Sequence, residues 1–181
     1  MSPVTSDPVS EDVALTALTA DLTAVYKNWD SLRGDAFAPS WQQFDLMTLP
    51  PRLIPTTMVV DIKEDMKQNT YRFWGSGLTN IHGREMTGGC PYDLQPPSLG
   101  ARLLEEHMDT IRRRSATARR LSFMTARGSP HHQELLRLPL SDDGETIHQI
   151  VVVVDYPPEI LEDLFHRDQV YADIVPKTGK D

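Results

Sequence analysis

Residues 71–94 read YRFWGSGLTNIHGREMTGGCPYDL, and the fold can be predicted outward from this stretch. It opens with alternating residues, Tyr71 and Phe73 on one side and Trp74 on the other, which is typical of a half-buried strand. Gly75 permits a bend or a close backbone approach, and the later glycines can stop short helices. We therefore expect one strand, followed by short helical turns that fold back across a sheet and wall a cavity.

Four blocks of sequence share a recognisable pattern. They are Tyr71-Arg72-Phe73 with Gly75-Ser76, His82-Gly83 and Glu85-Met86-Thr87-Gly88; Trp29-Asp30-Ser31-Leu32-Arg33; Pro39-Ser40-Trp41 with Phe44-Asp45-Leu46 and Leu49-Pro50; and Leu138-Pro139-Leu140-Ser141-Asp142-Asp143-Gly144. Together these blocks resemble the bacterial single-domain PAS family sometimes called PAS_5, over roughly residues 25 to 156. The resemblance implies a sensory or binding fold. It names no ligand, because fold-forming residues define the family.

The composition of the 181-residue chain limits the classes of function, and its length fits one domain with a substantial core. Eighteen basic and 26 acidic residues give a net charge of −8, which argues against nucleic acid or anionic membranes as partners. The single cysteine, Cys90, excludes an internal disulfide and a multi-cysteine zinc site, and it fits a reducing cytoplasm. No signal sequence or membrane-spanning run is recognisable, so we expect a cytoplasmic protein.

The N-terminal part predicts a disordered leader and a helix. Residues 1–9 are polar, and Ser10 fits the N-cap of a helix over 10–33. Apolar residues then recur at helical spacing: Leu15, Leu18, Leu22, Val25, Trp29 and Leu32. Two interpretations of this stripe stay open. The helix docks on the chain's own sheet, or it packs against a second subunit and forms a homodimer.

The remaining elements follow an order that matches PAS domains. The expected strands are 56–63, the strand from Tyr71, 117–125, 133–140 and 146–156, and a longer helix begins at Ser98. The β-branched run Ile150 to Val154 suits a central strand that is buried on both faces. The predicted fold class is α+β: a PAS-like five-stranded antiparallel sheet with helices over one face and an extra N-terminal helix. The PAS-like domain spans 34–166, and a C-terminal tail spans 167–181.

Motifs for catalysis or metal binding are missing from the sequence, which has no Gly-rich phosphate loop, HExxH or nucleophile elbow. The adjacent His131 and His132 would point to opposite faces of a strand, and we expect exposed loop histidines. The five arginines from Arg112 to Arg120 are interpreted as a solvated helix end and strand edge, not a phosphate site. Cys90 is interpreted as a small loop residue, because its Gly-Gly-Cys-Pro surroundings differ from the flavin-attaching signature of light-sensing PAS relatives.

His107 lies on the inner face of the long helix, at helical spacing from Leu103 and Ile111. The PAS resemblance implies an analogy with haem-binding members, in which the equivalent helix supplies the axial histidine. A histidine that is hydrogen-bonded at the edge of the core is the more common arrangement. The cofactor is therefore left unassigned.

These observations predict a small-molecule pocket between the sheet and the long helix. Its expected lining consists of Tyr71, Phe73, Trp74, His82, Leu104, His107, Met108 and Ile111. If Tyr71 and Phe73 face the cavity, strand alternation turns Trp74 to the outer surface.

We expect a non-catalytic sensory or signalling module that binds a small, largely apolar ligand, a protein partner, or both. One alternative is a protein-interaction module whose core is filled by side chains. The other is a small enzyme of the ketosteroid-isomerase type, for which Asp61 and Tyr71 are the candidate acid and tyrosine. The volume of the pocket distinguishes the first alternative from ligand binding. A convergent acid and tyrosine would support the second.

Overall fold

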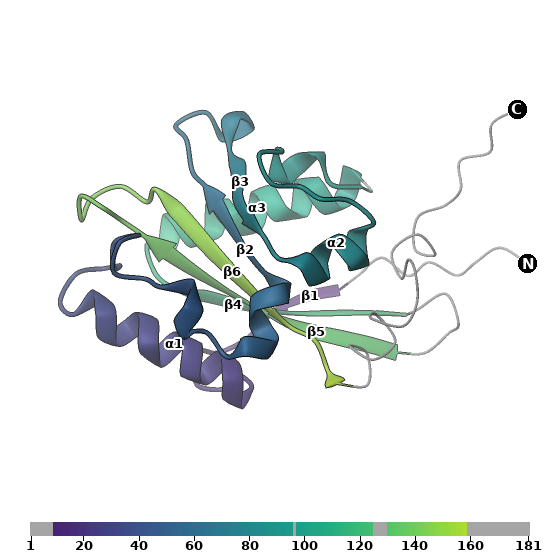
Figure 1. Cartoon of the computed structure of the whole chain (residues 1–181), viewed down its shortest axis with the longest axis horizontal. Coiled ribbons are helices and arrows are strands. Elements are labelled where there is room, and N and C mark those ends of the chain that lie inside the picture. Colours follow the sequence, from purple (N-terminus) through teal and green to yellow (C-terminus); the bar gives the residue numbers. More distant parts are fainter. Residues whose placement is uncertain (1–8, 96, 125–129, 159–181) are drawn as a thin grey trace, which may run out of the picture.

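The computed structural model describes residues 9–95, 97–124 and 130–158, which form a six-stranded antiparallel sheet with helices packed on it (Figure 1). The strands lie in the spatial order β1-β4-β5-β6-β2-β3. Their bounds are β1 (Val9–Asp12), β2 (Thr57–Asp61), β3 (Thr70–Trp74), β4 (Thr117–Met124), β5 (Pro130–Leu140) and β6 (Gln149–Asp155). Neighbouring strands pair antiparallel, which confirms the predicted α+β fold class; β1 adds a strand to the five expected.

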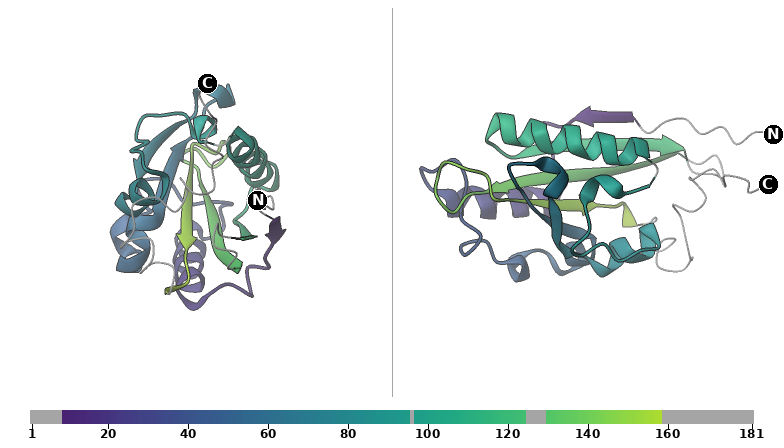
Figure 2. Two further views of the ribbon diagram at one scale, coloured as in Figure 1. Left: turned by 90° about the vertical axis from the view of Figure 1, so that its right-hand side faces the viewer. Right: turned by 90° about the horizontal axis from the view of Figure 1, so that it is seen from above.

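Helices cover both faces of this sheet. They are α1 (Ala20–Arg33), α2 (Ser76–His82), α3 (Pro97–Arg113) and the short turns η1 (Leu46–Thr48), η2 (Pro51–Thr56), η3 (Met66–Gln68) and η4 (Pro91–Asp93). From β2 onward the described chain follows the predicted order of two strands, short helices, a longer helix and three strands. Helices α2 and α3 pack with one apolar cluster, and the extra helix α1 packs with a second cluster on the opposite face (Figure 2).

The N-terminal segment differs from its prediction, because Ser10 lies in a strand and does not cap a helix. Strand β1 pairs with β4 at the edge of the sheet, and Asp12 forms an ion pair with Arg119 at 3.0 Å. Helix α1 begins only after Thr19, whose side chain caps it by accepting a backbone hydrogen bond. Hydrogen bonds to a distant strand outweigh the local N-cap signal, and the sequence pattern does not reveal them. Residues 1–8 of the expected leader lie outside the described residues.

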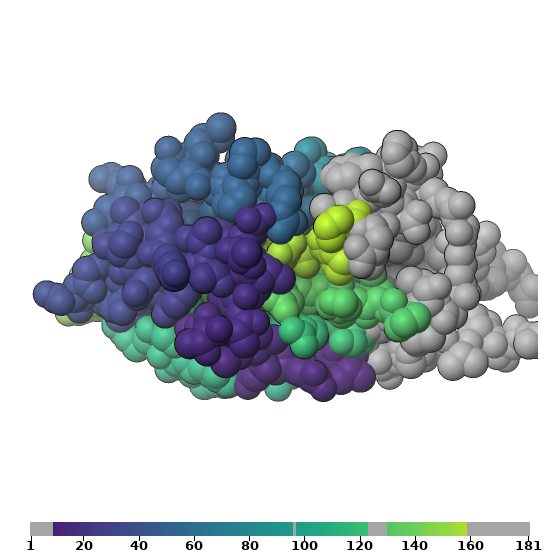
Figure 3. All heavy atoms as spheres, turned by 90° about the horizontal axis from the view of Figure 1, so that it is seen from below, coloured from purple at the N-terminus to yellow at the C-terminus, as the bar shows by residue number. Residues whose placement is uncertain are grey.

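Helix α1 docks on the chain's own sheet. Leu22, Val25 and Trp29 are buried in a cluster with residues of β5 and β6. The indole Nε1 of Trp29 donates a hydrogen bond to the carbonyl of Pro139 at 2.9 Å. Figure 3 shows the N-terminal half of the chain, in purple to blue, spread over this face beside parts of β5 and β6. The interpretation that the helix docks on the chain's own sheet is confirmed for α1. A homodimer through this helix stays a prediction, and the buried stripe no longer supports it.

A β-bulge in β3 changes which aromatic residues share a face. Met58 lies opposite Trp74, and Val60 lies opposite Tyr71, with two residues of β3 but one of β2 between these pairs. Tyr71 and Trp74 therefore both pack in the α3 cluster, whereas Phe73 packs against the α1 cluster. The expectation that Tyr71 and Phe73 share a face is wrong, because strand alternation assumes a ladder without a bulge.

Close backbone contacts at glycines set the positions of α2 and α3. A Cβ atom at Gly75 or Gly77 would collide with the backbone of Pro55, so only glycine lets α2 lie against η2. The close approach predicted at Gly75 is therefore confirmed. Gly100 has the same role in α3, where a Cβ atom would collide with the carbonyl of Tyr92 in η4. These contacts fix the walls of the space between the helices and the sheet.

Candidate ligand-binding site

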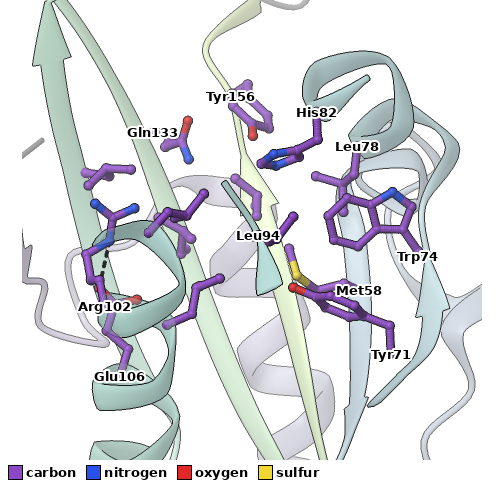
Figure 4. A pocket seen from close by; sticks show the side chains of 15 residues that line it. Met58, Tyr71, Trp74, Leu78, His82, Leu94, Arg102, Glu106, Gln133 and Tyr156 are labelled. Carbon is purple, nitrogen blue, oxygen red and sulfur yellow. Dashed lines mark ion pairs between the residues drawn. The ribbon is translucent and has the colours of Figure 1, made fainter. Parts of the chain in front are cut away.

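A cavity of about 40 Å³ lies between the sheet and helices α2 and α3 (Figure 4). Its apolar lining residues are Met58, Leu78, Leu94, Leu99, Leu103, Leu121, Leu135 and Val154. Its polar and aromatic lining residues are Tyr71, Trp74, His82, Arg102, Glu106, Gln133 and Tyr156. A cavity of this size accommodates a few water molecules or one very small organic molecule.

Three polar atoms at the cavity are buried without a hydrogen-bond partner among the described residues. They are the hydroxyl of Tyr71, the indole Nε1 of Trp74 and the side-chain oxygen of Gln133. A buried polar atom without a partner costs about 1–3 kcal/mol. Figure 4 shows the Tyr71 hydroxyl pointing into the space between the sheet and α3, whereas the nitrogen of Trp74 lies on the far edge of its ring. A small molecule inside the cavity can therefore pair with the Tyr71 hydroxyl.

The wall formed by β3 and α2 is aromatic and uncharged. The ring of His82 lies beside that of Trp74, with 5.3 Å between the ring centroids. Burial lowers the pKa of His82 to about 4, so the imidazole is neutral at physiological pH. Burial also raises the pKa of Tyr71, which keeps its hydroxyl protonated.

The wall formed by α3 carries charge. Glu106 forms an ion pair with Arg137 of β5, and Arg102 lies 3.8 Å from the same carboxylate. Ser10 of β1 donates a further hydrogen bond to Glu106 at 3.0 Å. The guanidinium of Arg137 is fully buried, and its Nε and Nη1 atoms have no hydrogen-bond partner among the described residues. Burial lowers the pKa of Arg137 because it disfavours the charged form.

His107 lies in the core beside Tyr92 and does not line the cavity. The Tyr92 hydroxyl accepts a hydrogen bond from Asn69 at 2.8 Å and lies 3.3 Å from Nδ1 of His107. Burial, and then the charge of Arg137, lower the pKa of His107 to about 3, so the ring is neutral. Either the Tyr92 hydroxyl or Nδ1 can be the donor in this contact, depending on the tautomer of His107. The Nε2 atom of His107 has no partner among the described residues.

The cavity includes three of the eight residues predicted for the site: Tyr71, Trp74 and His82. The outward placement considered for Trp74 is wrong, because the bulge turns it to the same side as Tyr71. Phe73 lies on the opposite face of the sheet. Ligand binding by any of these residues stays a prediction.

The four predicted residues of α3 lie away from the cavity lining. They are Leu104, His107, Met108 and Ile111, of which Met108 is 41% exposed. The helix presents Leu103 and Glu106 to the cavity, one position before Leu104 and His107. The apolar stripe of α3 is broad because the helix packs on η4 as well as on the sheet, so the stripe does not specify which part faces the cavity.

Sequence reasoning missed the charged and amide groups of the site. Glu106 interrupts the apolar stripe of α3. A charged residue at such a position indicates a buried polar group, and the sequence shows it. Gln133 and Arg137 gave no comparable signal, because the burial of a polar strand residue depends on which strands and helices surround it.

Four of the five arginines between 112 and 120 form ion pairs, and Arg114 donates to the carbonyl of Glu145. Arg113 and Arg119 contact Asp109 at 3.1 and 3.0 Å, and Arg120 contacts Glu134 at 2.7 Å. These contacts favour a structural role for the cluster over a phosphate site.

Two further expectations concern Asp61 and His131. The carboxylate of Asp61 pairs with Arg72 at 2.7 Å, and its neighbour Val60 faces the α3 cluster with Tyr71. Strand alternation therefore places Asp61 on the other face, and the proposed acid–tyrosine pair does not converge. His131 is buried in β5, so the expectation of an exposed loop residue is wrong there, whereas His132 is exposed.

Within the described ranges 9–95, 97–124 and 130–158, no group of at least three His, Cys, Asp or Glu side chains could hold a metal ion. No helix in those ranges is long and apolar enough to cross a membrane.

Comparison with known proteins gives similarities of fold only, since no family model and no curated protein matches the chain. One light-oxygen-voltage (LOV) domain is 16% identical, with 61% of this chain and 83% of that chain covered and a TM-score of 0.40. A fungal LOV photoreceptor is 16% identical over 77% of this chain and 93% of that chain, with a TM-score of 0.42. An RNA-binding LOV receptor is 12% identical over 91% of this chain but 42% of that chain, with a TM-score of 0.44. LOV domains are a PAS subfamily, but these similarities transfer no ligand or activity to the chain.

Proposed function

We propose that the chain is a non-catalytic sensory module that binds a small ligand in the cavity between the sheet and α3. The observation that supports this most strongly is that residues lining a largely apolar cavity have buried polar atoms with no hydrogen-bond partner in the described part of the chain. Leaving such atoms unpaired destabilises the folded state, and a ligand that pairs with them removes that cost. Ligand binding then stabilises the conformation in which the cavity is formed.

Glu106 gives the proposed sensor a route from the cavity to the edge of the sheet. Its side chain lines the cavity and also accepts the hydrogen bond from Ser10 in β1. Strand β1 has four residues, most of them exposed, so few apolar contacts hold it in place. A ligand that changes the position of Glu106 would therefore shift the population of attached β1, and a separate protein partner would respond to that change. A cytoplasmic location stays a prediction from the sequence.

The second candidate is a protein-interaction module without a ligand. The small volume of the cavity, about 40 Å³, favours this alternative because water alone can fill such a space. The two candidates differ in one measurable property, the saturable binding of small molecules at Trp74.

The test uses the indole N–H signals of Trp29 and Trp74 in a nuclear magnetic resonance titration. Trp74 lines the cavity, and its Nε1 has no partner within the described ranges, whereas Nε1 of Trp29 donates a hydrogen bond to Pro139 on the opposite face. A library of small organic molecules is titrated into the full chain. We expect at least one compound to shift the Trp74 signal saturably while the Trp29 signal stays in place.

Trp74→Phe assigns the signal and serves as the matched control, because it removes the reporter and keeps an aromatic ring. If no compound moves the Trp74 signal, the sensory proposal in its small-molecule form is wrong and the interaction module remains. Equal shifts at Trp29 and Trp74 would show non-specific binding and would also count against the proposal.

A further inference from the structure

Hydrogen-bond donors outnumber acceptors in the buried region between α3 and the sheet. Tyr71, His107 and Arg137 form what we call the donor cluster, and their exposed fractions are 1%, 1% and 0%. The Tyr71 hydroxyl, the His107 Nε2 and two nitrogens of Arg137 have no partner among the described residues. The guanidinium nitrogens only donate, the Tyr71 hydroxyl both donates and accepts, and the role of Nε2 of His107 depends on its tautomer. The cluster therefore has more donor than acceptor capacity.

Geometry links two groups of the donor cluster to the cavity. Tyr71 lines the cavity, and so does Glu106, the ion-pair partner of Arg137. Tyr71 and the pair of Arg137 with Glu106 therefore lie at the cavity, where β3, β5 and α3 meet, whereas His107 and Arg137 are outside its lining.

The same region also has more positive than negative charge. Glu106 is the carboxylate that pairs with both Arg137 and Arg102, so two guanidinium groups share one negative charge. Arg102 lines the cavity directly, and its side chain is only 22% exposed. Buried charges are stable when opposite charges and hydrogen bonds balance them. One further anion in the cavity would balance this charge and accept a hydrogen bond from the Tyr71 hydroxyl.

We propose that the ligand of the cavity is a short-chain monocarboxylate. This proposal rests on the proposed function and adds the chemical class of the ligand. Its carboxylate would accept a hydrogen bond from the Tyr71 hydroxyl and face the charge of Arg102, because both side chains line the cavity. Its alkyl part would contact the apolar walls, which include Met58 and Leu103. The volume of about 40 Å³ limits the ligand to the size of acetate or propionate.

The experiment compares ligands of equal shape and different charge on the full chain, in a buffer without chloride. Sodium acetate and sodium propionate are titrated against acetamide and propionamide, with the Trp74 indole signal and calorimetry as readouts. We expect the carboxylates to bind at least about tenfold more tightly than the amides, because hydrogen bonds to a charged group are the stronger ones. Sodium chloride is titrated separately as an anion without an alkyl part.

Two substitutions test the residues. Tyr71→Phe removes an unpaired hydroxyl and Arg102→Gln removes a partly exposed charge, so both variants should stay folded by circular dichroism. Each should weaken propionate binding by about tenfold while leaving propionamide binding less affected. Tyr26→Phe is the matched control, because Tyr26 stacks on Trp29 on the opposite face. It should bind propionate like the unmodified chain.

The outcomes separate the ligand class from the proposed function. Binding of the amides without preference for the carboxylates would overturn the carboxylate proposal and leave a neutral-ligand sensor in place. Chloride that binds as tightly as propionate would mean an adventitious ion only, and this result would overturn the proposal. Unchanged propionate binding by Tyr71→Phe would show that the donor cluster does not bind the ligand, and this result would overturn it as well. Failure of every compound, in this titration and in the library, would contradict both proposals.

Discussion

The two faces of the sheet differ in the hydrogen bonding of a buried tryptophan. On the α1 face, Trp29 is buried and its indole donates to the carbonyl of Pro139 at 2.9 Å. On the α3 face, Trp74 is equally buried, and its indole has no hydrogen-bond partner among the described residues. The α1 face is packed like an ordinary core, whereas the α3 face contains a cavity, unpaired donors and a buried ion pair.

This difference indicates a division of roles between the faces. A face whose polar groups are satisfied by the chain itself needs no other molecule for its stability. A face with unpaired buried groups has reduced stability, and natural proteins retain such features mainly where they bind something. We therefore expect the α1 face to determine stability and the α3 face to determine binding.

The largest effect is expected from a charge in the α1 cluster. Leu22 is fully buried there, so Leu22→Glu places an unpaired carboxylate in the core and should lower the free energy of unfolding by more than about 3 kcal/mol. The control is Met108→Glu on α3, a position that is 41% exposed, where the change should stay within about 0.5 kcal/mol. Urea denaturation measures both. Similar values for the two variants would mean that α1 is not packed as described.

A slightly smaller effect is expected for the buried ion pair of the α3 face. Glu106→Ala leaves the guanidinium of Arg137 buried without its carboxylate and should cost about 3–5 kcal/mol. The double variant Glu106→Leu with Arg137→Met removes both charges and should regain most of that loss. Asp30→Ala on α1, which breaks a largely exposed pair with Arg33, should cost no more than about 1 kcal/mol. A double variant as unstable as Glu106→Ala would contradict this account.

Acid should destabilise the α3 face through two histidines, the buried His107 and the half-buried His82. His82 and His107 have folded-state pKa values of about 4 and about 3, below the ordinary value of 6.5. Between these values and 6.5 the unfolded chain binds protons that the folded chain does not, so stability is complete above 6.5 and decreases as the pH falls. The expected slope is at most about 1.4 kcal/mol per pH unit for each histidine. His107→Phe should reduce the slope of unfolding free energy against pH over pH 4 to 6.5, and an unchanged slope would argue against burial of the neutral ring.

The smallest effect compares the two tryptophans directly. Trp29→Phe and Trp74→Phe remove similar volumes, but among the residues that the structure describes only Trp29→Phe breaks a hydrogen bond. The Trp29 variant should therefore be less stable than the Trp74 variant by about 1 kcal/mol in chemical denaturation. Equal losses would mean that the indole of Trp74 is as well satisfied as that of Trp29.

The candidate site was predictable only in part. The aromatic character of residues 71–94 and the helical spacing around 99–111 placed a pocket between β3 and α3, and a cavity is found there. The exact lining was not predictable, because the bulge in β3 moved Phe73 away and the orientation of α3 selected Leu103 and Glu106. Both depend on packing against other elements.

The sequence by itself determined the features that depend on local periodicity. The order of elements from β2 to β6 follows from alternating and helical patterns, and the continuous β-branched run gave the central strand β6, which is buried along its length. The stripe through Leu22, Val25 and Trp29 likewise specified one face of α1, because spacing on a helix fixes which side chains point together.

The tertiary structure alone decided the features that join distant parts of the chain. Ser10 and Glu106 are 96 residues apart in sequence, and Arg137 lies 31 residues from Glu106, yet the three side chains meet at one carboxylate. The pairing of β1 with β4 and the bulge opposite Val59 and Val60 are also set by contacts across the sheet. Such contacts depend on which surfaces the folded chain brings together, and local spacing carries no information about that choice.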